Sequence, residues 1–144
     1  MLTASKVAGG LLVLSALLGI GILSLDQVLQ KYAPMHYYGL IVFVIVDVAV
    51  GFLLSAEPKR AYLTLAMVWS IVRIIIQIAD VSQAQASGFS GYGQFADYLF
   101  NPMSGVSAQL GNLPGIPAAL IDLIILLDIV VAVVAWLGRS SKSN

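Results

Sequence analysis

Long hydrophobic runs alternate with short polar stretches along this chain, and four of the runs are long enough to cross a membrane. Residues 7–25 form an uncharged run of 19 residues. A membrane-spanning helix needs roughly 20 apolar residues to cross about 30 Å of hydrocarbon. Runs with polar insertions follow at 37–54, 61–78 and 117–137. The pattern predicts an all-α integral membrane bundle of four transmembrane helices, forming one domain over residues 1–144.

The composition supports a membrane protein. The chain is 60% hydrophobic and 10% charged, whereas a soluble domain is about 45–50% apolar and about 25% charged. Seven basic residues balance seven acidic ones, so no basic field exists to hold a nucleic-acid backbone. We therefore expect the lipid bilayer, and not nucleic acid, as a partner. The absence of cysteine excludes disulfides, iron–sulfur clusters and cysteine nucleophiles.

The first run could also be a secretory signal peptide. It is longer than the typical hydrophobic region of about 7–15 residues, and no small-residue cleavage motif precedes Asp26. We therefore expect this run to remain as the first helix.

Positive charge gathers on one side of the predicted bundle. That side holds Lys6, Lys59, Arg60, Arg139 and Lys142, and the other side holds Lys31. Because positive residues favour the cytoplasmic side of a membrane, we expect both termini in the cytoplasm of a multi-pass protein of the cell membrane. Residues 26–36 and 79–116 are then external. Aromatic spacing predicts a short surface helix at 94–100.

The sequence contains no P-loop and no recognisable catalytic motif. We expect no catalytic site, no cofactor and no metal site within the chain. His36 is the one histidine, and it lies at the predicted outer membrane surface. A copper or haem site closed within this chain would need further ligands, which the chain does not contain. We therefore favour an interfacial role for His36 over a role as a metal ligand.

Charged residues inside the predicted spans are the most informative feature. They are Asp47, Arg73, Asp122 and Asp128. A charge at the centre of a transmembrane helix costs roughly 2.5–3.5 kcal/mol, so each needs compensation. Depth counted along the helices predicts that Arg73 reaches Asp128 or Asp122 more easily than Asp47. It favours Asp128 as the main partner, which leaves Asp122 nearer Gln77 or the outer water. Three carboxylates against one arginine leave at least one aspartate neutral, bound to a cation, or paired with another protein.

Two helix faces carry small or polar residues at helical spacing. Trp69, Arg73, Gln77 and Asp80 follow an i, i+4, i+8, i+11 pattern, which predicts a polar stripe facing the bundle interior or a partner. Ser15 and Gly19 form a small-xxx-small pair that lets helices approach closely in lipid. We favour packing within the chain's own bundle, with contact to another subunit as the alternative.

Residues 26–47, DQVLQKYAPMHYYGLIVFVIVD, resemble small hydrophobic proteins of ammonia-oxidising archaea, some of which are accessory subunits of the ammonia monooxygenase, a copper membrane monooxygenase. The stretch contains no catalytic motif, so no functional residue is carried over. The resemblance implies a membrane-embedded accessory subunit beside copper-bearing subunits that this chain does not itself supply.

Two functions follow as hypotheses. The first is an accessory or structural subunit of a multi-subunit membrane complex, in which this chain assembles with other integral membrane subunits. The resemblance implies that the complex as a whole is an oxidoreductase. The alternative is a small proton- or cation-conducting transporter or channel that uses Asp47, Asp122 or Asp128. Transport folds often contain helices broken at Gly or Pro, and no such break interrupts these spans, which favours the first hypothesis. A stand-alone enzyme is the least favoured.

Overall fold

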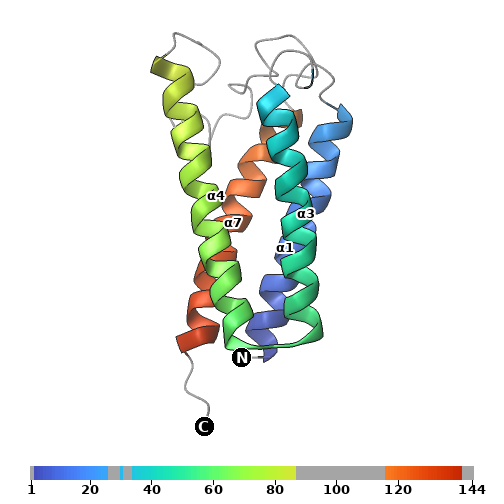
Figure 1. Cartoon of the computed structure of the whole chain (residues 1–144), viewed down its shortest axis with the longest axis vertical. Helices are drawn as coiled ribbons and strands as arrows, with labels where there is room; N and C mark the ends of the chain where they lie inside the picture. The colour runs from blue at the N-terminus through green and yellow to red at the C-terminus, as the bar shows by residue number, and fades with distance from the viewer. Residues whose placement is uncertain (1, 26–29, 31–33, 87–115, 141–144) are drawn as a thin grey trace.

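Four long α-helices make up the computed structural model, which describes residues 2–25, 30, 34–86 and 116–140, without the side chains of 34–36, 78–86, 116–119 and 122. In chain order the helices are α1 (Leu2–Leu25), α3 (Pro34–Ala56), α4 (Arg60–Ala86) and α7 (Ile116–Ser140). Each contains a stretch long and apolar enough to cross a membrane. They run alternately up and down the long axis of the molecule (Figure 1). The prediction of four helices able to span a membrane is confirmed.

The helices extend beyond the apolar runs that predicted them. The first begins at Leu2, and α4 continues to Ala86, so eight residues of the segment assigned to an external loop, 79–86, belong to a helix. Hydropathy detects the part of a helix that fits in hydrocarbon, whereas a helix can continue into the polar sequence beyond it. The predicted helix at 94–100 and the side chain of His36 lie outside the described residues.

Contacts between the helices follow the order α3, α1, α7, α4. The α1 helix packs along α3 and α7, and α4 packs along α7, whereas α3 and α4 touch each other little. Figure 1 shows that α4 and α3 diverge at the end of the bundle opposite the chain termini. A hydrophobic core joins the helices near the end that holds both termini, and it consists of Ala8, Leu12, Val50, Leu54, Leu63, Ala66, Val131 and Ala135.

Glycine permits the close approach of α1 and α3. A Cβ atom added at Gly9 would lie 2.9 Å from the carbonyl oxygen of Gly51, and one added at Gly51 would lie 3.0 Å from the carbonyl oxygen of Gly9. Backbone atoms cannot move aside as a side chain can. In lipid, where packing holds helices together, such contact between small residues is a main source of association.

A tight link reverses the chain between α3 and α4. The Glu57 N–H donates to the Leu53 carbonyl at 3.0 Å, and the N–H groups of Tyr62 and Leu63 donate to the Lys59 carbonyl at 3.1 and 3.2 Å. The Lys59 ammonium forms a salt bridge with the Glu57 carboxylate. The hydrogen bond within this salt bridge raises the pKa of Lys59 above its ordinary value.

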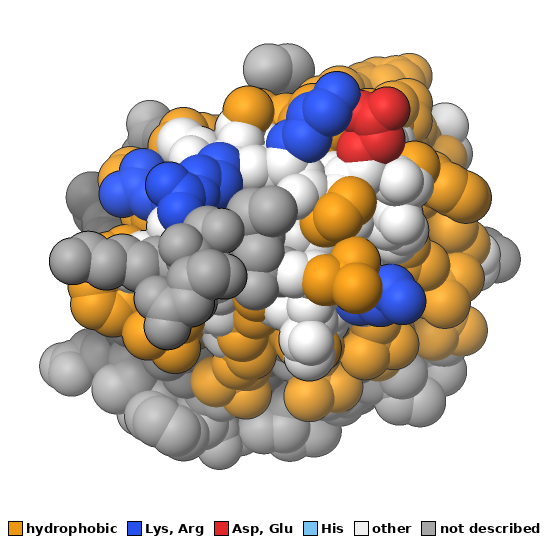
Figure 2. Space-filling view, turned by 90° about the horizontal axis from the view of Figure 1, so that it is seen from below, with side chains coloured by type: hydrophobic (Ala, Val, Ile, Leu, Met, Phe, Trp, Pro, Cys, Tyr) orange, Lys and Arg blue, Asp and Glu red, His pale blue; other side chains and the backbone are white. Residues whose placement is uncertain are grey.

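Basic side chains gather at the end of the bundle that holds this link. Figure 2 views that end and shows Lys and Arg side chains around its rim. Among the described residues, the exposed basic side chains at this end are Lys6, Lys59, Arg60 and Arg139. The described basic residues are therefore distributed between the two ends as the sequence predicted.

Candidate functional site

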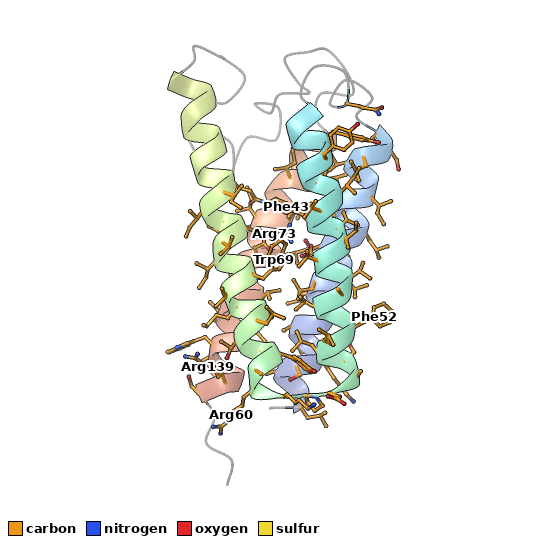
Figure 3. The ribbon with its side chains drawn as sticks, in the orientation of Figure 1. Phe43, Phe52, Arg60, Trp69, Arg73 and Arg139 are labelled. Carbon is orange, nitrogen blue, oxygen red and sulfur yellow. The ribbon has the colours of Figure 1, made fainter. Side chains whose placement is uncertain are left out.

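A buried cluster of charged side chains lies about halfway along the bundle (Figure 3). It consists of Asp47 from α3, Arg73 from α4 and Asp128 from α7, and we call it the ion cluster. The exposed fractions are 1% for Asp47, 1% for Arg73 and 0% for Asp128. Charged groups removed from water to this extent must be paired or hydrogen-bonded. The contacts of Arg73 therefore determine what the cluster does.

The closest contacts of Arg73 are with Asp47. Its Nη1 donates to Oδ1 of Asp47 at 2.6 Å and lies 2.5 Å from Oδ2. The indole Nε1 of Trp69 donates to the same Oδ1 at 2.8 Å. Trp69 and Arg73 are four residues apart and so project from one face of α4. The Asp47 carboxylate thus ties α3 to α4, two helices that otherwise touch little.

Phe43 completes the junction between α3 and α4. The guanidinium carbon of Arg73 lies 5.0 Å from the centre of the Phe43 ring, within the range of a cation–π interaction. The Phe43 and Trp69 rings meet edge to face, with centres 5.7 Å apart and planes at 84°. Phe43 precedes Asp47 by one helical turn. The pair Phe43 and Asp47 on α3 therefore faces the pair Trp69 and Arg73 on α4. Phe52, further along α3, points outward instead (Figure 3).

The remaining two helices also reach Arg73. Oδ1 of Asp128 on α7 lies 3.3 Å from Nη1, a distance that allows ionic attraction, but neither carboxylate oxygen of Asp128 has a hydrogen-bond partner among the described residues. The hydroxyl of Ser15 on α1 accepts a hydrogen bond from the same Nη1 at 3.3 Å. Arg73 therefore contacts a polar group from each of the other three helices.

The depth estimate chose the wrong main partner for Arg73. It favoured Asp128 over Asp47, whereas Asp47 holds the hydrogen bonds and Asp128 lies further away. Every helical side chain slants towards the N-terminus of its own helix. Because α3 and α4 are antiparallel, the slants of Arg73 and Asp47 bring the two groups together, and the same holds for Asp128, since α7 is also antiparallel to α4. The slant therefore makes Asp47 reachable, and the Trp69 donor is what distinguishes it from Asp128. Counting backbone rise alone left both features out.

The other residues singled out in the sequence have varied positions. Gln77 is half-buried on α4, and its buried Oε1 atom has no hydrogen-bond partner among the described residues. Asp122 belongs to α7, but its side chain lies outside the described residues, so its expected place near Gln77 or the outer water stays a prediction. Ser15 and Gly19 are buried on α1, and a Cβ atom at Gly19 would lie 2.6 Å from Cγ2 of Val44 on α3. Both small residues face the interior of this bundle.

Sequence reasoning did not include Phe43, which belongs to the site, or Ser70, a buried residue of α4. Phe43 was available from its spacing, because it lies four residues before Asp47 on the same helical face. Ser70 is fully buried, and its hydroxyl has no hydrogen-bond partner among the described residues. It precedes Arg73 by three residues, and that spacing is the one signal that marks it.

The arrangement can fix the relative positions of four helices. Within the described ranges, no group of three or more His, Asp or Glu residues is placed to hold a metal ion. No protein-family model matches the chain, and no curated protein or solved structure shows significant similarity to it. Its function is therefore argued from the ion cluster, the apolar helices and the distribution of charge.

Proposed function

We propose that this chain is an accessory or structural subunit of a larger complex in the cell membrane, without a catalytic site of its own. The observation that carries the proposal is the ion cluster with its Ser15 contact, to which each of the four helices contributes one polar side chain. Breaking a buried ion pair costs about 3–5 kcal/mol, so such a cluster holds the helices in one arrangement. A bundle fixed in this way offers constant outer faces for neighbouring subunits.

The outer faces of the bundle suit lipid and other membrane proteins. Large apolar side chains are exposed along all four helices, among them Leu17, Ile45, Phe52, Ile75 and Val133. These faces are compatible with hydrocarbon or with the apolar helices of integral membrane partners. We take other integral membrane subunits as the partners of this chain.

The class of the parent complex rests on the resemblance of residues 26–47 to accessory subunits of archaeal ammonia monooxygenase. Most of this stretch lies in α3, and the stretch ends at Asp47. On this proposal the complex is an oxidoreductase whose copper is held by other subunits, and the present chain supplies a rigid helical support beside them.

The proposed orientation places both termini in the cytoplasm and residues 79–116 outside. Its support is the exposed basic rim formed by Lys6, Lys59, Arg60 and Arg139 at the end that holds the termini. Basic residues are retained on the cytoplasmic side of membranes and attract anionic headgroups there.

Purification from the native membrane tests the proposed function. The chain, tagged at one terminus, is extracted in mild detergent, and the proteins that accompany it are identified and quantified. A structural subunit brings the same integral membrane proteins in constant ratio. An Arg73→Leu variant, in which the helices lose their common contact, should bring less of them than a Thr64→Ala control, because the Thr64 hydroxyl bonds only the Arg60 carbonyl of its own helix at 3.0 Å. Recovery of the chain free of other subunits would contradict the proposal.

One observation favours a second function, that of a small proton- or cation-conducting transporter or channel. The ion cluster holds two carboxylates for one guanidinium, and both Asp128 oxygens lack hydrogen-bond partners among the described residues. An intramembrane aspartate of this kind is a potential carrier of a proton or cation. Proton or sodium flux into liposomes containing the purified chain, lost in Asp128→Asn, would support this function over the first.

A further inference from the structure

Two arginines mark the edge of the apolar region at the end of the bundle that holds the termini. Arg60 is the first residue of one candidate membrane span and Arg139 is the last residue but one of another, and Figure 3 labels both at this end. A Cβ atom added at Gly138 would lie 3.4 Å from Cδ1 of Leu63, so the last turn of α7 packs against the first turn of α4. The two arginines therefore belong to one part of the basic rim, which we call the arginine patch.

Positive charge exceeds negative charge at this end of the bundle. Figure 2 shows adjoining Lys or Arg side chains on part of the rim. Among the described side chains, Glu57 is the one exposed acidic residue, and it forms a salt bridge with Lys59. The first turn of α4 contains no acidic residue, and the last turn of α7 contains Arg139. The arginine patch therefore favours an anion as its ligand.

Apolar side chains continue from the arginine patch into the membrane. Trp136 precedes Arg139 by three residues, so the two side chains share a face of α7. Trp136 is 52% exposed, and Val133, about one turn further in, is 50% exposed. Indole rings favour the headgroup level of a bilayer. A ligand of the patch therefore meets guanidinium groups at one end and an apolar helix face at the other, which suits a phospholipid better than a free phosphate ion.

We propose that the arginine patch binds the headgroup phosphate of one anionic phospholipid, whose acyl chains lie along Trp136 and Val133. The planar guanidinium group of arginine matches phosphate oxygens in a two-pronged arrangement. The headgroup supplies the negative charge that this end of the bundle lacks, and the lipid covers the junction of α4 and α7 at the membrane surface. The site goes beyond the proposed role as a subunit, because it is a property of the chain itself and needs no partner protein.

Quenching of tryptophan fluorescence by lipids with brominated acyl chains tests the site. The purified full-length chain is placed in phosphatidylcholine bilayers that contain increasing amounts of brominated phosphatidylglycerol or, in parallel, brominated phosphatidylcholine. The quenching that Trp136→Phe removes reports the lipid beside the arginine patch. A basic residue near the membrane surface contributes about fivefold to anionic lipid binding. We therefore expect phosphatidylglycerol to be favoured at least about fivefold, and Arg60→Gln or Arg139→Gln to reduce this preference about fivefold.

A Lys6→Gln variant is the matched control, because it removes the same charge from the same end. Ala4 faces Gly138 on α7, and Lys6, two residues later, projects from the opposite side of α1, so the preference should not change. An equal reduction in Lys6→Gln and Arg139→Gln would overturn the proposal.

Two measurements on the wild-type chain can also overturn it. The first is equal quenching of Trp136 by the two brominated lipids. The second is loss of the preference in sodium phosphate but not in sodium chloride of the same ionic strength, which would assign the arginine patch to free phosphate. Because neither measurement involves other subunits, failure of the lipid site would leave the co-purification test unaffected.

Discussion

Replacing Asp47 by leucine tests the contact that joins α3 to α4. The carboxylate is 1% exposed and accepts hydrogen bonds from Arg73 and Trp69. Removing one partner of a buried ion pair costs about 3–5 kcal/mol, because the remaining charge stays buried. The orphaned Trp69 N–H costs on the order of 1–3 kcal/mol. Asp128, 3.3 Å from Arg73, offsets part of this loss, so we expect a decrease of about 3–5 kcal/mol in the free energy of unfolding.

A double-mutant cycle isolates the pair. Arg73→Leu should be as harmful as Asp47→Leu, because it leaves two carboxylates buried near each other. The double variant replaces the pair by apolar side chains, which recovers much of the loss, but it still leaves Asp128 buried without its arginine. We therefore expect a coupling energy of at least about 1.5 kcal/mol between Arg73 and Asp47, as for other close charge pairs. The Arg73–Asp128 cycle should give a smaller value, because that contact is longer and has no hydrogen bond.

Reversible unfolding in mixed micelles, followed by circular dichroism as denaturing detergent is added, measures both cycles. The reasoning is refuted if Arg73→Leu and Asp47→Leu add to within about 0.3–0.5 kcal/mol, which is the behaviour of independent sites. It is also refuted if Arg73 couples more strongly to Asp128 than to Asp47, which would restore the order of partners that depth alone suggested.

Three further predictions concern packing, hydrogen bonding and topology. Gly9→Ala should lower the unfolding free energy by about 1–3 kcal/mol, because its Cβ meets a backbone carbonyl of α3. The control Gly10→Ala adds a Cβ with nothing within 4 Å and should be neutral or raise the unfolding free energy by up to about 1 kcal/mol. Equal losses in the two variants would show that α1 packs differently. Trp69→Phe keeps an aromatic ring but removes the N–H donor, so unfolding in micelles should show a loss of about 1.5–3 kcal/mol, and no loss would remove this hydrogen bond from the account. Cysteines at Lys59 and Ser90 should be labelled from opposite sides of the membrane; labelling from the same side would contradict the proposed topology.

The helical architecture was predictable from hydropathy, and the helix ends were not. Uncharged or nearly uncharged runs of about 20 residues have few structural solutions other than a transmembrane helix. Hydropathy does not report how far a helix continues into polar sequence. The extension of α4 to Ala86 therefore had to come from the structure.

The members of the ion cluster were predictable, and their pairing was not. Asp47, Arg73 and Asp128 stand out because charge is rare in such runs. Which aspartate holds Arg73 depends on the donors nearby, and Trp69 supplies one such donor to Asp47. Phe43 carries no polar signal at all. Its place in the site follows from its contacts with Arg73 and Trp69 on α4, which only the structure shows.

The central claim, that this chain is a fixed part of a larger membrane assembly, is tested most directly by native mass spectrometry of the detergent-extracted complex from the source membrane. The account predicts particles in which this chain is present at a constant copy number together with other integral membrane subunits, and from which Arg73→Leu removes it. Particles composed of this chain alone, as a monomer or a homo-oligomer, would contradict the claim and would direct attention to Asp128 as a carrier of protons or cations.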